Sequence, residues 1–211
     1  DGTIKFLFAL SSGRNIETVL IPDFTQDGAP KRMTVCVSSQ VGCAMGCSFC
    51  ATGLMGFQQN LTSGEIAEQV QHANRAALST WEMPVTNVVF MGMGEPLANY
   101  AGTIAAIRWL TRPDGLGLRQ RGITVSTVGV VPGILELAKR PEQFRLALSL
   151  HAPSSELRRE LIPLERRHPL PEVLAALEHF DDGGGKRITF EYTMIAGVND
   201  APELIGPLGD L

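Results

Sequence analysis

The sequence predicts an α/β fold: a partial, TIM-like (β/α) barrel with an open parallel sheet, preceded by a short β-hairpin. Short apolar runs typical of buried strands alternate with longer segments typical of helices, an order that gives parallel strands joined by right-handed crossovers. The 211 residues are too few for a closed eight-stranded barrel, which needs about 250. Hydrophobic residues make up 44% and charged residues 19% of the chain, as in folded globular domains.

The first part of the chain predicts the hairpin. Segments 4–9 and 17–22 are short and largely apolar and lie on either side of the turn Ser-Ser-Gly-Arg-Asn, which is typical of two paired strands. The run Gln-Asp-Gly-Ala-Pro at 26–30 indicates a second turn. We therefore expect residues 1–31 to form an N-terminal hairpin extension and residues 32–211 to form the core.

The core is predicted to contain five buried strands separated by helices. The expected strands are 33–38, 87–91, 122–127, 144–150 and 187–195. The expected helices are 62–79, 101–110, 132–139, 170–180 and a segment from 201 onward, with a helical turn at 154–160. Thr62 followed by Glu65 is a capping signal, Pro132 lies near a helix start, and Asp-Asp-Gly-Gly-Gly ends the helix over 170–180.

Small and polar residues follow the ends of these strands. They are three cysteines after the first strand, Gly94 and Glu95 after the second, Ser126 at the third, Ser149, Leu150 and His151 at the fourth, and Asn199 after the fifth. Each has an ordinary structural explanation, such as a tight turn, a satisfied backbone group or a hydrogen-bonded histidine. Ligands of parallel α/β folds bind beyond the carboxyl ends of the strands, so their common edge favours a ligand site.

The three cysteines, Cys43, Cys47 and Cys50, form a C-x-x-x-C-x-x-C triplet. Three thiolates at this spacing can hold one side of a cubane iron–sulfur cluster, which normally has four cysteine ligands. A closed structural zinc site is disfavoured because it needs four ligands, and the four histidines are scattered. A catalytic zinc site stays open as an alternative, whereas a disulfide framework does not suit so few cysteines. The triplet therefore predicts a cluster with one iron open to a ligand.

Charge and composition argue against a stand-alone nucleic-acid binder and against a membrane-spanning protein. The net charge of −4 argues weakly against a stand-alone nucleic-acid binder. Local basic clusters occur at Arg119 and Arg121, at Arg158 and Arg159, at Arg166, Arg167 and His168, and at Lys186 and Arg187. We interpret each as a solvated surface, although together they could form one patch. No apolar run reaches transmembrane length, and the scarcity of cysteine suits a reducing cytoplasm.

The motifs resemble those of the radical S-adenosylmethionine enzymes, in which an aromatic residue, here Phe49, precedes the third cysteine. The strings CVSSQVGCAMGCSFCATGLMGFQQNLTSGEI, MGMGEPL, VSTVGVVP, LALSLHAP and GVND are similar, in order and spacing, to one family in particular. That family comprises the radical adenine methyltransferases of large-subunit ribosomal RNA and transfer RNA. The similarity covers nearly the whole chain and implies a partial barrel of the radical S-adenosylmethionine type.

The resemblance implies roles for the strand-end residues. Cys43, Cys47 and Cys50 would bind a [4Fe-4S] cluster whose open iron chelates S-adenosylmethionine. Gly94 and Glu95 would hold the methionine amino group. The rest of the cofactor would contact Ser126, Ser149, Leu150, His151 and Asn199. Phe49 would pack near the adenine, with simple core packing as the alternative.

Two further residues acquire a role only from the resemblance. Cys36 would break a covalent thioether between enzyme and RNA by attacking as a thiol; otherwise it is a small buried apolar residue. Glu17 would handle a proton on the adenine ring; otherwise it is an exposed strand residue. Both are expected catalytic residues.

One departure from the family pattern sets a limit. The family has a methyl-carrying cysteine far downstream, whereas Cys50 is the last cysteine here. The chain also starts at Asp1 and ends in what reads as the beginning of a helix. We expect a fragment that lacks both ends, binds the cluster and S-adenosylmethionine, and does not methylate RNA by itself.

Several alternatives stay open. Methylation at carbon 2 of adenine is favoured over carbon 8, the reaction of the antibiotic-resistance type. Other readings are a radical enzyme with a small-molecule or peptide substrate, and a non-catalytic module that binds an iron–sulfur cluster. The expected partners are ribosomal and transfer RNA and a one-electron donor such as flavodoxin, with a cytoplasmic monomer and no membrane contact.

Overall fold

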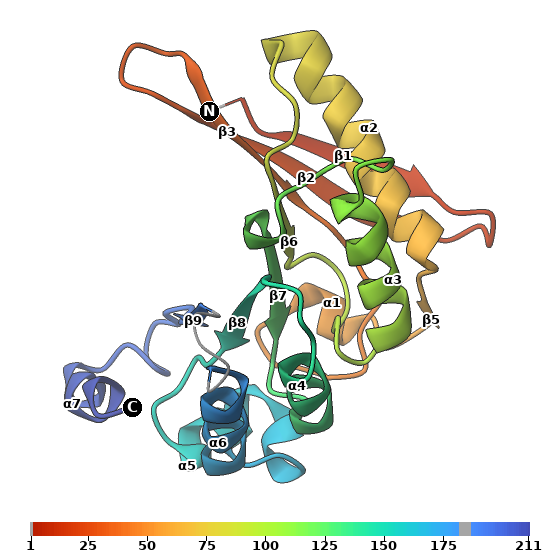
Figure 1. The fold of residues 1–211 in the computed structure, drawn as a ribbon. Coiled ribbons are helices and arrows are strands. Elements are labelled where there is room, and N and C mark those ends of the chain that lie inside the picture. Colours follow the sequence, from red (N-terminus) through yellow and green to blue (C-terminus); the bar gives the residue numbers. More distant parts are fainter. Residues whose placement is uncertain (1, 182–186) are drawn as a thin grey trace.

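A seven-stranded mixed sheet is the centre of the fold in the computed structural model, which describes residues 2–181 and 187–211 (Figure 1). Its strand order is β1 (Ile4–Ala9), β2 (Asn15–Phe24), β3 (Pro30–Cys36), β6 (Asn87–Phe90), β7 (Ile123–Thr127), β8 (Arg145–Ser149) and β9 (Ile188–Glu191). A separate two-stranded sheet pairs β4 (Gln40–Val41) with β5 (Gln59–Asn60). The helices are α1 (Ala51–Leu54), α2 (Ser63–Trp81), α3 (Tyr100–Thr111), α4 (Val131–Ala138), α5 (Ser155–Leu161), α6 (Leu170–Asp181) and α7 (Ile205–Gly209). Three short 3-10 helices are η1 (Gln120–Gly122), η2 (Pro163–Arg166) and η3 (Pro202–Leu204).

The predicted hairpin and the predicted parallel sheet are both confirmed. β1 pairs antiparallel with β2, and β2 pairs antiparallel with β3. From β3 onward all neighbouring strands are parallel, with helices in the crossovers. The hairpin thus extends the same sheet as the core strands, and a division at residues 31/32 falls inside β3. Our domain boundary there stays a prediction.

The two faces of the sheet differ in chemistry. The face toward the helices buries Val35, Val88, Val125, Leu146 and Leu148, all with 0% exposure. α2 packs on β2 and β3, and α4 packs against α6 (Figure 1). The opposite face, which we call the open face, carries Cys36, Val89, Ser126, Ser149 and Glu191, as the parallel register requires. No helix among the described residues is long and apolar enough to span a membrane.

The last predicted strand is shorter than expected. We predicted a strand over 187–195, but β9 ends at Glu191. Beyond it the backbone bonds to side chains instead of a neighbouring strand: Thr193 N donates to His151 Nδ1, and Ile195 N donates to Asn199 Oδ1. The predicted helix from 201 onward is the 3-10 turn η3 followed by the short helix α7. We predicted that Asp-Asp-Gly-Gly-Gly ends the helix over 170–180. Of this motif the structure describes only Asp181, and Lys186 of the predicted basic cluster also lies outside the described residues.

The start of α2 shows the predicted capping box. Thr62 Oγ1 accepts from Glu65 N, and Glu65 Oε2 accepts from Thr62 N. This pair satisfies backbone donors that an uncapped helix leaves without partners.

Thr62→Ala is expected to lower the free energy of unfolding by about 1 kcal/mol, because it removes the acceptor for the Glu65 amide. Urea denaturation followed by circular dichroism measures this change. Thr80→Ala, at an exposed position in the same helix, is the control and is expected to be neutral or slightly stabilising. Equal stability of the two variants would contradict the capping role.

Candidate active site

The cysteine loop follows β3 and is held in place from several sides. Cys43 N donates to Gly56 O at 3.1 Å, which closes the loop on itself, and Ser48 N donates to Leu161 O at 3.0 Å. Upstream, the Gln69 amide of α2 bonds both the N–H and the carbonyl of Ser38. The loop is therefore fixed relative to α2 and α5 by backbone contacts.

A pocket of about 240 Å³ lies where this loop meets the carboxyl ends of the parallel strands. It brings together eight of the residues predicted from sequence: Cys43, Cys47, Cys50, Gly94, Glu95, Ser126, Ser149 and His151. Phe49, Met91 and Glu191 also line it. Leu150 and Asn199 do not line the pocket, and neither do Glu17 and Cys36.

The three pocket cysteines are close enough to influence one another. Burial, and then the neighbouring Cys43 and Cys50, raise the pKa of Cys47 to about 12. Burial also raises the pKa of Cys43. All four cysteines lie in the described part of the chain, and none forms a disulfide.

The three thiols line one pocket, as a cubane held by three cysteines requires. Among the described residues no three His, Cys, Asp or Glu side chains converge closely enough to hold one ion. The three cysteine ligands of a cubane bind three different irons and therefore do not converge on one point. Cys47 also packs on Ala152, Leu161 and Ile162, an apolar wall that limits water.

Glu95 joins the ends of two strands. Its Oε1 accepts from Leu97 N at 2.9 Å, and its Oε2 accepts from Val128 N, beyond β7, at 3.0 Å. Burial raises the pKa of this carboxyl to about 7, against the lowering effect of the two backbone amides. Its own amide donates to Gln40 Oε1 at 2.8 Å. Glu95 thus ties the turn after β6 to the segment after β7, and it also lines the pocket.

Position 94 requires glycine because of its backbone conformation and its close approach to Gln40. Its φ is +100°, and a Cβ there would lie 2.5 Å from Gln40 Cβ. Any larger residue would push this pocket-lining turn away from the cysteine loop.

His151 is held in an unusual conformation. Its φ is +55°, in the left-handed region that non-glycine residues seldom occupy. Its Nδ1 accepts from Thr193 N at 3.0 Å, so the neutral ring carries its proton on Nε2. Burial, and then Arg158, lower the pKa of His151 to about 4. The ring of Phe49 packs edge-on at a centroid distance of 4.7 Å.

Asn199 supports this histidine from outside the pocket. Its Nδ2 donates to His151 O at 2.8 Å and to Thr193 O at 2.9 Å. Its Oδ1 accepts from Ile195 N. The amide is therefore fully used in joining two loops.

Arg158 corrects our interpretation of the basic clusters. It is not at a solvated surface but has 0% exposure, and it pairs with the equally buried Glu165 at 2.5 Å. Its Nη2 donates to Val128 O at 2.6 Å, and its Nε donates to Leu150 O at 3.2 Å. The guanidinium therefore ties the segments after β7 and β8 together beneath the pocket. Its neighbour Arg159 is exposed, as expected.

Glu17 and Cys36 lie together on the open face, beside the pocket. Val19 is the register partner of Cys36, so Glu17 is its diagonal neighbour on the same face. Lys5 Nζ lies 2.6 Å from Glu17 Oε1. Burial is the main cause that raises the pKa of Cys36 to about 11; the Met91 amide acts against it, and Glu191 adds to it.

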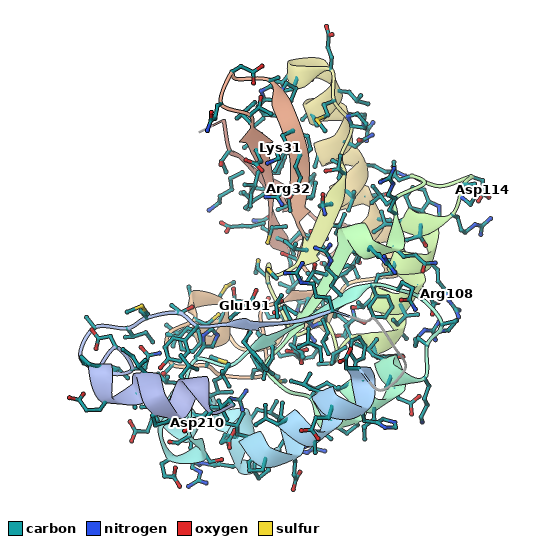
Figure 2. The ribbon with its side chains drawn as sticks, turned by 60° about the vertical axis from the view of Figure 1, so that its left-hand side comes forward. Lys31, Arg32, Arg108, Asp114, Glu191 and Asp210 are labelled. Atoms are coloured by element: carbon teal, nitrogen blue, oxygen red, sulfur yellow. The ribbon has the colours of Figure 1, made fainter. Side chains whose placement is uncertain are left out.

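Glu191 is a charged pocket residue that our sequence reasoning missed (Figure 2). Its Oε2 accepts from Ser126 Oγ at 3.1 Å and from Ser149 Oγ at 3.3 Å. The alternation in Ile-Thr-Phe-Glu could have revealed it, because a period of two places Thr189 and Glu191 on the face opposite Ile188 and Phe190.

A larger groove, of about 750 Å³, lies between α2 and α3. It contains no thiol, and its two arginines are already paired: Arg108 with Glu142, and Arg112 with Asp114 (Figure 2). The smaller pocket holds the reactive side chains and is the better candidate.

Comparisons with known proteins identify the family of this chain. The family model of the Radical SAM superfamily matches residues 37–205. The chain is 52% identical over 211 residues to the probable dual-specificity RNA methyltransferase RlmN of Gemmatimonas aurantiaca, covering 100% of this chain and 55% of that protein. It is 47% identical over 213 residues to the ribosomal RNA large subunit methyltransferase N of Nitrosopumilus maritimus, covering 100% of this chain and 60% of that protein. The chain thus spans a little over half the length of these curated relatives.

Solved structures share the fold. The structure of a radical SAM methyltransferase from Sphaerobacter thermophilus has a TM-score of 0.92 at 50% identity, covering 99% of this chain and 59% of that one. Streptococcus suis SuiB bound to S-adenosylmethionine has a TM-score of 0.54 at 17% identity, covering 82% of this chain and 34% of that one, and shows likeness of fold alone. The family model spans the cysteine loop, all the pocket-lining strand ends and η3, and this chain belongs to the radical SAM superfamily.

Proposed function

We propose that this chain is the core of an enzyme that methylates carbon 2 of adenine in 23S ribosomal RNA and in transfer RNA. The observation that supports this most strongly is the pocket in which three thiols meet residues from the ends of the parallel strands. The names of the relatives in Gemmatimonas aurantiaca and Nitrosopumilus maritimus favour RNA as the substrate.

The donor set of the pocket fits a [4Fe-4S] cluster. Cys43, Cys47 and Cys50 would each bind one iron, and S-adenosylmethionine would occupy the fourth. When bound, the cluster supplies one electron for reductive cleavage of the sulfonium. The apolar residues around Cys47 would exclude water from this side of the pocket.

The other pocket residues would orient the cofactor. Gly94 and Glu95 would hold the methionine amino group, and Ser126, Ser149 and His151 would contact the remainder. Leu150 would contribute through its backbone, since its side chain is buried in the core. Asn199 would act by holding the His151 segment in place. Phe49 would pack near the adenine.

Glu17 and Cys36 would serve the RNA. Both lie on the open face of the sheet, where Glu17 would handle a ring proton of the adenine. Cys36 would attack the thioether that joins enzyme and RNA and so release the product. We infer further that the enzyme is a cytoplasmic monomer, does not contact membranes, and receives its electron from a flavodoxin-type donor.

Anaerobic reconstitution with iron and sulfide tests the cofactor. The wild-type protein is expected to bind about four irons per chain. Addition of S-adenosylmethionine is expected to change the electron paramagnetic resonance spectrum of the reduced protein. Cys47→Ala should lose the cluster, whereas Cys36→Ala, which removes a cysteine outside the pocket, should keep it. Zinc in place of iron, or equal iron in both variants, would contradict the proposal.

Methyl transfer from radiolabelled S-adenosylmethionine tests the RNA chemistry. In a reconstituted enzyme that contains this core together with the methyl-carrying cysteine, Glu17→Gln and Cys36→Ala are expected to keep cofactor cleavage and to lose methylated adenine. Loss of both reactions together would show that these residues act on the cofactor instead.

A further inference from the structure

The carboxylate of Glu191 is one of the charged groups that line the pocket, and it has no role in the proposed function. It lies at the carboxyl end of β9, in register with Ser149 of β8. Ser126 of β7 completes a row of three polar side chains from three adjacent strands on the open face. The row exists because each strand places every second residue on this face.

The two oxygens of this carboxylate have different surroundings. Oε2 is anchored, because it accepts from the hydroxyls of both Ser126 and Ser149. Oε1 accepts no hydrogen bond from any described residue, and no described cation lies within 4.0 Å of the carboxylate. The described residues include no buried polar side-chain atom without a partner, so Oε1 is open to the pocket.

Such a group is well suited to bind a ligand. An ionised carboxylate is a stronger acceptor than a neutral oxygen, and the two serines fix its orientation before the ligand arrives. A carboxylate with one oxygen left open in a partly buried pocket also favours a ligand that brings hydroxyl or ammonium donors.

The place of Glu191 in the sheet selects the donor. The cysteine loop and the turn at Gly94 and Glu95 follow β3 and β6, on one side of the pocket, whereas Glu191 lies on β9, at the other. If the amino-acid end of S-adenosylmethionine lies beside the cysteines, its nucleoside end extends toward β8 and β9. We propose that Oε1 of Glu191 accepts a hydrogen bond from a ribose hydroxyl of S-adenosylmethionine, an inference that rests on the proposed function.

The test compares two ligands and three proteins, all reconstituted with iron and sulfide. Equilibrium dialysis measures the dissociation constants of S-adenosylmethionine and of its analogue that lacks both ribose hydroxyls. Glu191→Ala is expected to weaken binding of S-adenosylmethionine by about tenfold or more. Wild type should bind the analogue about as weakly, and Glu191→Ala should distinguish little between the two ligands. Glu178→Gln, which neutralises an exposed carboxylate on α6, is expected to behave as wild type.

The outcomes separate three possibilities. An alanine variant that binds S-adenosylmethionine as tightly as wild type would overturn the inference. So would an equal loss for both ligands, because a purely structural residue does not sense the hydroxyls. If the alanine variant does not retain iron, Glu191→Met takes its place in the same comparison with the same two criteria, because methionine nearly keeps the size of the side chain but has no oxygen acceptor. A wild-type protein with four irons that binds neither ligand would instead contradict the proposed function.

Discussion

Arg158→Ala is expected to lower the free energy of unfolding by about 3–5 kcal/mol, the cost of leaving one partner of a buried ion pair without the other. Arg158 and Glu165 are both fully buried, and the guanidinium also donates to carbonyl groups of Val128 and Leu150. Its removal would leave the Glu165 carboxylate in an apolar interior and deprive these carbonyl groups of a donor. Guanidinium chloride denaturation measures the loss.

Arg159→Ala is the matched control, because it removes the same side chain one residue further along α5, where it is exposed. Its expected effect is within about 0.5 kcal/mol of zero. A loss below about 1 kcal/mol for Arg158→Ala would show that water or a rearranged Glu165 replaces the guanidinium. In the reconstituted protein the Arg158 variant should also bind S-adenosylmethionine more weakly, since Val128 and His151 border the pocket.

Gly42→Ala is expected to displace the cysteine loop and to abolish stable cluster binding. Gly42 has φ of +70°, and a Cβ there would lie 1.8 Å from Gly56 O, the acceptor of the Cys43 amide. The strained φ and the overlap together are expected to cost about 2–4 kcal/mol. Iron content after anaerobic reconstitution, together with the thermal midpoint, measures both consequences.

Gly56→Ala separates the effect of backbone strain from the effect of the overlap with Gly56 O. Gly56 has nearly the same φ, +66°, but a Cβ there would meet no atom within 4 Å. This variant should lose about 1–2 kcal/mol from backbone strain alone and keep its iron. If both variants lost iron equally, the overlap with Gly56 O would not be the reason for glycine at position 42.

Much of the fold was predictable because its signals are local. The apolar run at 87–91 and its counterparts gave the parallel strands, and the rule that ligands bind at their carboxyl ends placed eight predicted residues around one pocket. Whether these residues perform the roles that the family resemblance assigns stays a prediction.

Other features depend on contacts that sequence spacing does not reveal. Arg158 reads as a surface residue because its partners come from two strand ends and from η2. β9 ends early because the N–H groups of the residues beyond it donate to the side chains of His151 and Asn199 instead of to a neighbouring strand. Glu191 was not predicted as a site residue because it lies in a strand of four residues and belongs to no recognisable sequence motif.

The alternation of side chains along β8 links the folding of this protein to its chemistry. A slip of one residue would move Leu148 into the pocket and press Ser149 against the helices. A mispaired chain would therefore lose hydrophobic burial and the pocket-lining hydroxyl in the same step. The packing of the interior and the chemistry of the pocket thus depend on the same register of one strand.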